Sequence, residues 1–358
     1  MAKRETLEKS PIIKPKTRLT INQEELVGLY YKKDRPIDFI HSGSTLLDCV
    51  LGGGWPLGRV CNIVGDKSTG KTLLAIEACA NFKHQFDSQI FYQEAEAAFD
   101  EDYAEALGFP KKSVKFIDNV ETVEDLFDNM ADITRAGMKQ KVKEPILYVT
   151  DSLDAITDRA EQAKANKDGI GKSAEGKGDY GAAKAKQMSK LFRLLTKDLK
   201  KTKVCWMVIS QIRDKIGVSF GETKERAGGH ALDFYAAQVL WLAQLAKVKK
   251  TIDKIEKVIG INILALCKKN KISLPYRDCA FPLIFAYGVD DATSCLRWLS
   301  DITDGLDHFD IAKDDVTSMG EQLRAGEYPD VAEAIQRHTV KRWWEIEAKF
   351  LPKKRKYA

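Results

Sequence analysis

The chain has 358 residues, of which 44% are hydrophobic and 30% charged, and its formal net charge is +5. This length and apolar content suit one large globular domain or two smaller ones. No apolar run reaches the ~20 residues of a membrane span, and the first residues lack the apolar segment of a signal peptide, so we expect a cytoplasmic protein that does not enter a membrane. Seven scattered cysteines without a CxxC pair argue against a disulfide framework or a zinc site.

Positive charge is concentrated in two segments. Residues 1–36 hold nine Lys or Arg against five Asp or Glu, and residues 159–190 hold eight against four, so each segment carries a local charge of +4. A solvated surface is the simplest interpretation of either segment. The second lies between nucleotide-binding motifs, however, and this position favours a contact with a polyanion.

The elements begin with an appendage, residues 1–38, in which a Pro- and Lys-rich opening precedes a helix candidate at 23–31. From about residue 39 onward, apolar strand candidates alternate with helical patterns, clearest at 123–136 and 182–200. This alternation predicts a wound α/β core with a largely parallel sheet. The strand candidates are 60–64, 89–93, 114–117, 146–150, 204–209 and 239–242, followed by 261–267 and 280–286.

The most specific motif lies between the first strand candidate and a helical stretch at 71–80. It reads GDKSTGKT and fits the pattern GxxxxGK[ST] of a phosphate-binding loop. In such a loop, backbone N–H groups and a helix N-terminus hold phosphates, the Lys neutralises their charge, and the Thr contacts Mg²⁺. The residues expected to bind the nucleotide are therefore Gly65, Asp66, Lys67, Ser68, Thr69, Gly70, Lys71 and Thr72.

Acidic residues follow two other strand candidates. Asp151 ends the apolar run ILYVTD, as expected for a carboxylate that contacts Mg²⁺ through water. Glu94 and Glu96 follow the strand at 89–93 on the same side of the chain, and either could be the general base. The residues alone do not distinguish these two.

The end of the chain changes character. An acidic stretch at 301–315 precedes a helix candidate at 332–350 and a basic ending, PKKRKYA. We predict a small α-rich C-terminal domain with a basic tail. The pair Trp343 and Trp344 is interpreted as a packing anchor.

Three blocks resemble the bacterial RecA recombinases and their phage relatives. They are HSGSTLLDCVLGGGWPLGRVCNIVGDKSTGKT at 41–72, EAEAAFDEDYAEALGF at 94–109 and SQIRDKIGVSFGETKERAGGHALDFYA at 210–236. The resemblance implies a RecA-like P-loop ATPase core with a mostly parallel sheet. It divides the chain into an N-terminal polymerisation segment (1–38), the ATPase and DNA-binding core (39–299) and a small C-terminal domain (300–358).

The resemblance also implies roles for individual residues. It assigns water activation to Glu96 rather than Glu94, with Lys71 and Gln211 as the other catalytic residues, Gln211 sensing the γ-phosphate. Adenine would be bound by Tyr103 and Asp100, and Mg²⁺ by Thr72 and Asp151. Two further lysines, separated by one residue so that both would face one way on a strand, would reach the ATP of the neighbouring subunit; they are Lys269 and Lys271.

Two DNA-binding loops are implied as well. The second, at about 212–227, carries cations for phosphate contacts and apolar residues that could wedge between bases, namely Arg213, Lys215, Ile216, Phe220, Lys224 and Arg226. The first, at about 161–183, is longer than the bacterial pattern and rich in Gly and Lys, and we expect disorder there without DNA. Tyr180 is the expected stacking residue, and Lys184 a further DNA contact.

The resemblance implies an ATP- and Mg²⁺-dependent DNA recombinase, with DNA-stimulated ATP hydrolysis. Expected partners are single-stranded DNA, homologous duplex DNA, further copies of the chain in a helical filament, and single-strand-binding and mediator proteins. Two alternatives stay open. One is a hexameric DNA-motor ATPase of the helicase type, and the other is an ATP-binding single-strand annealing or regulatory protein without strand exchange.

Overall fold

The computed structural model describes residues 38–96, 99–140, 144–168, 180–214, 224–226, 229–354 and 356. These residues form two compact units, one ending at Asp290 and the other beginning at Asp291. The sequence instead suggests a boundary between residues 299 and 300. The helix candidate at 23–31 and nearly all of the expected N-terminal segment lie outside the described residues.

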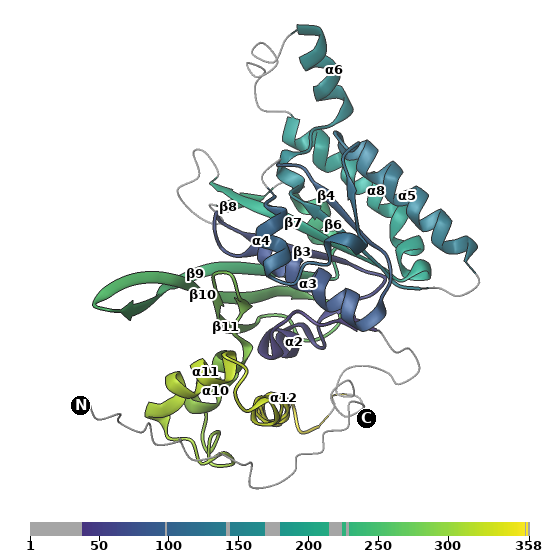
Figure 1. The fold of residues 1–358 in the computed structure, drawn as a ribbon. Helices are drawn as coiled ribbons and strands as arrows, with labels where there is room; N and C mark the ends of the chain where they lie inside the picture. Colours follow the sequence, from purple (N-terminus) through teal and green to yellow (C-terminus); the bar gives the residue numbers. More distant parts are fainter. Residues whose placement is uncertain are drawn as a thin grey trace. The chain divides into compact units, whose positions relative to one another are not determined.

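A twisted sheet lies at the centre of the first unit (Figure 1). Its strand order is β12-β11-β10-β9-β3-β7-β6-β4-β5, and β8 pairs with β7 beside this path. The strands from β9 to β5 run parallel, whereas β10, β11 and β12 continue one edge in antiparallel fashion. The α/β class with a mostly parallel sheet is therefore confirmed. The strands are β3 (Val60–Gly65), β4 (Ile90–Glu94), β5 (Val114–Ile117), β6 (Ile146–Asp151), β7 (Val204–Asp214), β8 (Lys224–Arg226), β9 (Gln238–Ile252), β10 (Ile255–Asn270), β11 (Arg277–Ile284) and β12 (Gly288–Val289).

Helices cover both faces of this sheet. On one face, side chains from neighbouring strands, such as Tyr148 of β6 and Trp206 of β7, pack with the helices α5 and α8 in one core cluster. The helix α3 packs against β3, β6 and β7 with its buried residues Leu74, Cys79 and Phe82. The first unit contains the helices α2 (Thr45–Leu51), α3 (Lys71–Phe86), α4 (Glu101–Ala106), α5 (Val123–Lys139), α6 (Arg159–Asp168), α8 (Tyr180–Thr202) and α9 (Gly229–Tyr235), the short helices η1 (Lys111–Ser113) and η2 (Leu153–Ala155), and the two-stranded sheet of β1 (Phe39–Ile40) with β2 (Trp55–Pro56).

Local sequence accounts for the ends of these helices. The side chain of Thr122 accepts a hydrogen bond from the backbone of Asp125, and Asp125 bonds back to Thr122, which is a complete capping box for α5. In α2, Ser44 caps the start, and Gly52 ends the helix with a positive φ of 85°. These signals fix where α5 and α2 begin and where α2 ends, and so hold them in register with the sheet.

Two expectations need correction. The sequence predicts strands at 239–242 and 261–267, but β9 and β10 are much longer and form one hairpin. The sequence also predicts disorder through residues 161–183, yet α6 is helical to Asp168 and α8 begins at Tyr180. An ion pair of Arg159 with Asp125, at 2.7 Å, ties the start of α6 to α5.

The second unit is helical, as predicted. A buried cluster that includes Leu296, Phe309 and Ile335 joins its helices. Trp343 is buried and packs on Trp298 with ring centroids 5.6 Å apart, which confirms its role as a packing anchor. The elements are α10 (Asp291–Asp301), η3 (Lys313–Asp315), α11 (Val316–Arg324) and α12 (Pro329–Phe350). Throughout the described parts of the chain, no helix combines the length and apolarity needed to span a bilayer.

This helical unit should lose stability in mild acid because of His338. Its ring is buried, stacks on His308 with centroids 5.1 Å apart and meets Phe309 edge-on. Burial, with the nearby charges of His308 and Arg342, lowers the pKa of His338 to about 4. Because the folded pKa lies below that of an unfolded histidine, stability is fully present above pH ~6.5 and is lost as pH falls toward 4. We expect a loss of about 2 kcal/mol between pH 7 and pH 5.

Thermal unfolding at several pH values measures this effect, and His338→Phe is the control. Phenylalanine keeps an aromatic ring against His308 and Phe309 but cannot bind a proton. Between pH 7 and pH 5 the free energy of unfolding of the variant should therefore fall by about 2 kcal/mol less than that of the wild type. An equal loss in both proteins would contradict the assignment to His338.

Candidate nucleotide-binding and DNA-binding site

The phosphate loop closes on itself between β3 and α3. Asp66 is its centre: the Lys67 backbone N–H donates to Asp66 Oδ1 at 2.7 Å, and the Thr69 hydroxyl donates to Asp66 O at 2.9 Å. Lys71 Nζ donates to the same carbonyl at 2.6 Å. Gly70 has a φ of +81°, and a Cβ there would lie 2.3 Å from Leu283, so glycine is required at the start of α3.

Two predicted metal ligands lie side by side at the carboxyl end of the sheet. The Thr72 hydroxyl donates to Asp151 Oδ2 at 2.8 Å, and the Tyr92 hydroxyl donates to the same oxygen at 2.9 Å. Burial raises the pKa of Asp151, whereas burial lowers the pKa of Lys71 against the opposing pull of Asp151 and Glu96. One hydroxyl and one carboxylate, with phosphate oxygens and water completing the shell, are the ligands that Mg²⁺ takes in P-loop proteins. The residues present therefore fit a bound Mg²⁺.

Glu96 and Glu94 separate in the structure. Glu96 Oε1 accepts hydrogen bonds from Gln211 Nε2 at 2.8 Å and from the Ser152 hydroxyl at 2.5 Å. Glu94 turns back, and its Oε1 accepts from the Glu96 backbone N–H at 3.0 Å. The backbone N–H of Gln211 also donates to Asp154 Oδ2 at 2.6 Å. Sequence reasoning missed Ser152 and Asp154, although both directly follow the acidic end of β6.

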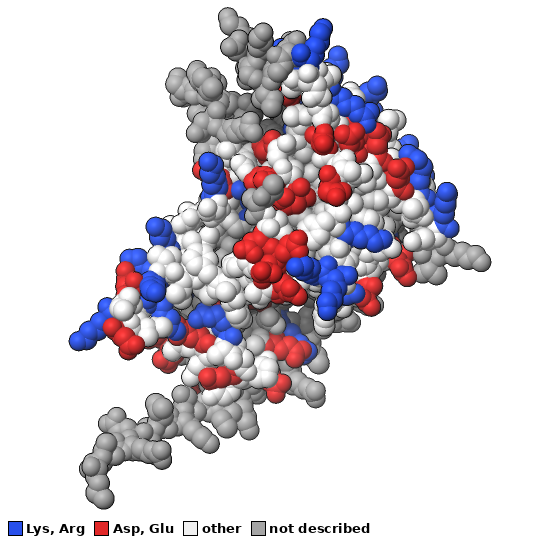
Figure 2. Space-filling model, turned by 45° about the horizontal axis from the view of Figure 1, so that its top comes forward, with Lys and Arg blue, Asp and Glu red and all other residues white. Residues whose placement is uncertain are grey.

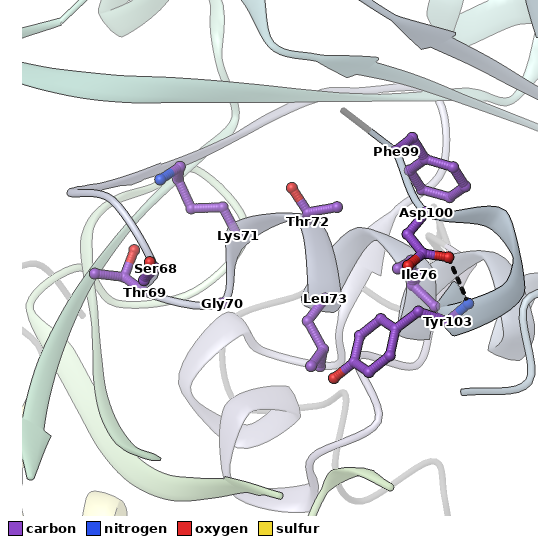
Figure 3. A pocket seen from close by; sticks show the side chains of 10 residues that line it. All are labelled: Ser68, Thr69, Gly70, Lys71, Thr72, Leu73, Ile76, Phe99, Asp100 and Tyr103. Carbon is purple, nitrogen blue, oxygen red and sulfur yellow. Dashed lines mark hydrogen bonds between the residues drawn. The ribbon is translucent and has the colours of Figure 1, made fainter. Parts of the chain in front are cut away.

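A pocket of about 360 Å³ joins the phosphate loop to the start of α4 (Figure 3). The expected adenine-binding residues Asp100 and Tyr103 line this pocket together with residues of the phosphate loop. Asp100 Oδ1 caps α4 by accepting from the Tyr103 backbone N–H at 2.9 Å. Leu73, Ile76 and Phe99 form an apolar part of the lining that the sequence reasoning did not include; the other lining residues are Ser68, Thr69, Gly70, Lys71 and Thr72.

Further aromatic side chains lie near this pocket. The Tyr103 hydroxyl accepts a hydrogen bond of 3.4 Å from the backbone N–H of Ala286. Phe285 and Tyr287, on either side of Ala286, are about half exposed. These residues connect β11 with β12, so an exposed aromatic turn lies beside the Tyr103 hydroxyl.

The two lysines expected to act on a neighbouring subunit converge, although β10 ends at Asn270 and only Lys269 lies within the strand. Lys269 Nζ donates to the carbonyl of Phe234 at 2.9 Å and to that of Asp233, and Lys271 Nζ donates to Phe234 O at 3.0 Å. These carbonyls lie in the last turn of α9, where cations are favourable. Lys271 Nζ also lies 5.7 Å from the ring centre of Phe234.

The expected second DNA loop is described only at its base. Its β7 and β8 ends pair antiparallel, with Arg213 opposite Glu225 and Ile212 opposite Arg226. Lys224 pairs with the last residue of β7. The other predicted contacts, Lys215, Ile216 and Phe220, lie outside the described residues.

The expected first DNA loop ends at α8. Tyr180 is the first residue of that helix. Lys184 is half-buried and donates to the carbonyls of Leu153, at 3.0 Å, and Ile156. Its ammonium group therefore braces the segment after β6, next to the residues that hold Gln211, and is less available for DNA than an exposed lysine.

Sequence reasoning missed a row of exposed cations along α8. At 100° per residue they fall within an arc of about 80°, and they extend over about 21 Å of the helix. None of the five forms an ion pair with any residue that the structure describes. The periodic spacing was the available signal. We call these residues the α8 stripe: Lys186, Lys190, Arg193, Lys197 and Lys200.

A phosphate loop, a strand-end Asp beside its Thr, and a neighbouring Glu on a parallel sheet define a P-loop nucleotide-binding protein. Residues 18–290 match the family of the RecA N-terminal domain. The chain belongs to the RecA family, and its core is the RecA-like fold.

Known relatives agree with this assignment. The chain is 30% identical over 322 residues to Protein RecA of Streptomyces venezuelae, covering 86% of this chain and 77% of that protein. It is 34% identical over 256 residues to Protein RecA of Delftia acidovorans, covering 71% and 63%. For Protein RecA of Leifsonia xyli subsp. xyli the identity is 30% over 317 residues, covering 84% and 80%. The part of the relative's length that lies outside the match therefore ranges from a fifth to more than a third.

Proposed function

We propose that this chain is an ATP-dependent DNA recombinase that acts in recombination and repair. It assembles into a helical filament on single-stranded DNA and catalyses homologous pairing and strand exchange with duplex DNA. ATP binds between adjacent subunits and holds the DNA-binding state, and hydrolysis releases it. Base pairing between strands, rather than protein side chains, supplies the sequence specificity.

The hydrogen bond between Gln211 and Glu96 carries this proposal. In this proposal Glu96 activates the water that attacks the γ-phosphate, beside Asp151 and the phosphate loop. Gln211 lies in β7 only one residue before the second DNA loop begins. A change at the γ-phosphate that breaks or makes the bond therefore acts directly on the base of that loop, which is the coupling that a DNA-dependent ATPase requires.

The site supports ATP and Mg²⁺ as the cofactors. Lys71 and the loop backbone would bind the phosphates, and Thr72 and Asp151 would hold Mg²⁺. The pocket continues to Tyr103 and Asp100, so a base can lie on the tyrosine while its edge meets the carboxylate. The bound metal would neutralise charge on the phosphates, and Glu96 would accept the proton of the attacking water.

The α8 stripe is proposed to contact the bound strand. Removing three of its charges, Lys190→Gln, Arg193→Gln and Lys197→Gln, should weaken single-strand binding and lower the salt slope of log K by about 0.7 for each phosphate that the variant no longer neutralises. The matched control removes three exposed lysines outside α8, Lys112→Gln in η1, Lys115→Gln in β5 and Lys139→Gln in α5. Fluorescence anisotropy with a labelled oligonucleotide at several salt concentrations measures both variants. Equal slopes in the two variants would contradict a role for the stripe.

D-loop formation is the direct test of the proposed function. A single-stranded oligonucleotide and a homologous supercoiled duplex should form D-loops with ATP, and not with ADP or without nucleotide. Electron microscopy of the same reactions should show open helical filaments. Closed rings that hydrolyse ATP without D-loops would instead indicate the DNA-motor alternative, and annealing without ATP dependence would indicate the annealing protein.

A further inference from the structure

Tyr92 is a fully buried tyrosine whose hydroxyl reaches the carboxylate expected to act on Mg²⁺. It lies in β4, two residues before Glu94, and Glu94 pairs with Asp151 of β6. Side chains two residues apart on a strand point to the same face, so Tyr92 and Asp151 share one face of the sheet. From β4 the Tyr92 hydroxyl crosses to the neighbouring strand and donates to Asp151 Oδ2 at 2.9 Å.

Asp151 is held through both its main chain and its side chain. The Ala95 backbone N–H donates to the Asp151 carbonyl at 2.8 Å. The hydroxyls of Thr72 and Tyr92 both donate to Oδ2, at 2.8 Å and 2.9 Å. Each oxygen of a carboxylate has two lone pairs, so these two hydroxyls occupy the accepting capacity of Oδ2. Oδ1 is therefore the oxygen left for the water shell of a bound Mg²⁺.

The ring of Tyr92 is held by three phenylalanines. Its centroid lies 5.0 Å from that of Phe99, 5.8 Å from that of Phe109 and 5.9 Å from that of Phe116. The three phenylalanines also contact one another, with centroids 5.3–6.1 Å apart. A buried ring packed on several sides has little freedom to move, so its hydroxyl is presented to Asp151 in one direction.

This aromatic cluster also reaches the nucleotide pocket. Phe99 lines the pocket, next to Asp100 (Figure 3). Tyr92 therefore contacts a residue of the pocket wall through its ring and the metal-binding carboxylate through its hydroxyl. One buried side chain thus connects the part of the site expected to hold the base with the part expected to hold the metal.

Packing alone does not require a hydroxyl at this position. The other three rings of the cluster are phenylalanines, and a phenylalanine in place of Tyr92 would fill the same space. A hydroxyl taken out of water costs free energy unless it finds a partner, and the partner here is a carboxylate oxygen. Hydrogen bonds to ionised acceptors are the stronger ones, and metal ligands are commonly oriented by such bonds. Orientation of Asp151 therefore accounts for the hydroxyl.

We propose that Tyr92 is a positioning residue for Mg²⁺, because its hydroxyl fixes the orientation of the Asp151 carboxylate. Tyr92 itself contacts neither the nucleotide nor the metal. The proposal deepens the proposed function and rests on it, since it concerns the same ATP and Mg²⁺ site. Without the hydroxyl, the affinity for Mg²⁺ falls, whereas the affinity for the nucleotide alone and the rate at excess Mg²⁺ are retained.

The test variant is Tyr92→Phe, and Tyr148→Phe is its matched control. Tyr148 is also a buried tyrosine, in the neighbouring strand β6, but its hydroxyl donates to Asn129 Oδ1 at 3.1 Å. Each full-length protein is saturated with a fluorescent, slowly hydrolysed ATP analogue, and its fluorescence is followed as buffered free Mg²⁺ is raised. The Mg²⁺ concentration at the midpoint should rise about tenfold in Tyr92→Phe, as is usual when a group that orients a metal ligand is lost. In Tyr148→Phe it should stay at the wild-type value.

Two further measurements distinguish positioning from a purely structural role. The affinity for the analogue in EDTA should be the same in Tyr92→Phe and wild type. Excess Mg²⁺ should bring DNA-stimulated hydrolysis in Tyr92→Phe to within about threefold of the wild-type rate, because the change is in metal binding and not in the maximum rate. Weaker binding of the analogue in EDTA, or a rate that excess Mg²⁺ does not restore, would overturn the proposal.

The wild type tests the proposed function separately. If the wild type binds the analogue without any response to Mg²⁺, or shows no DNA-stimulated hydrolysis, the proposed function fails and the role of Tyr92 fails with it. If the wild type responds to Mg²⁺ and hydrolyses ATP, but the midpoints of Tyr92→Phe and Tyr148→Phe are equal, only the role of Tyr92 is overturned.

Discussion

Glu96→Gln should lower DNA-stimulated ATP hydrolysis by about 10²–10⁴-fold, the usual contribution of a positioned general base. The amide cannot accept a proton from the attacking water. Its oxygen can still accept the hydrogen bonds that Glu96 receives from Gln211 and Ser152, so ATP binding and filaments on single-stranded DNA should persist. Phosphate release in the presence of oligonucleotide measures the rate, and electron microscopy measures assembly.

Glu94→Gln is the matched control for this experiment. The chemical change is identical and lies two residues away, but the Glu94 carboxylate bonds to the Glu96 backbone. We expect a rate within about tenfold of wild type, since only the positioning of Glu96 is disturbed. A loss at Glu94 as large as that at Glu96 would reverse the roles of the two carboxylates.

The central strands could be predicted because burial on both faces leaves a continuous apolar run. Val60–Gly65, Ile146–Asp151 and the first half of Val204–Asp214 are such runs. The projecting part of the β9–β10 hairpin, residues 243–259, could not be predicted in this way. Within the described parts of the chain it packs against no neighbouring element that would require apolar residues, and its lysines are typical of a solvated segment. Its turn, Asp253–Lys254, also lacks the glycine that usually marks a two-residue hairpin.

Site residues could be identified from the sequence where one motif contains several of them. Their identification stayed ambiguous where it depends on the three-dimensional path of the chain. The spacing of GDKSTGKT fixes Lys71 and Thr72 together. Glu94 and Glu96 have the same parity on an extended strand, so only the path of the chain after β4 separates them. Ser152 and Asp154 contact Glu96 and Gln211 across strands, and no spacing within one segment reveals such contacts.

Replacing the paired lysines, Lys269→Gln and Lys271→Gln, should lower hydrolysis in filaments by about 10²–10³-fold, as for other removed charge-stabilising donors. Each glutamine can still donate to the carbonyls at the end of α9, so the local structure is retained while the positive charge is lost. Nucleotide binding to the unassembled chain should be unchanged. The control is Lys268→Gln: this lysine lies over the ring of Trp241, 3.6 Å from its centre, and its loss should leave the rate near wild type.

Mixing two inactive variants tests whether these lysines act across the interface. One subunit carries Glu96→Gln, and the other carries Lys269→Gln with Lys271→Gln. In a head-to-tail filament each nucleotide site takes Glu96 from one subunit and the lysines from its neighbour. A random equal mixture therefore forms about a quarter of its sites from two intact halves, and hydrolysis should recover to about a quarter of the wild-type rate. If the lysines acted within their own subunit, no site would be intact and the mixture would stay inactive.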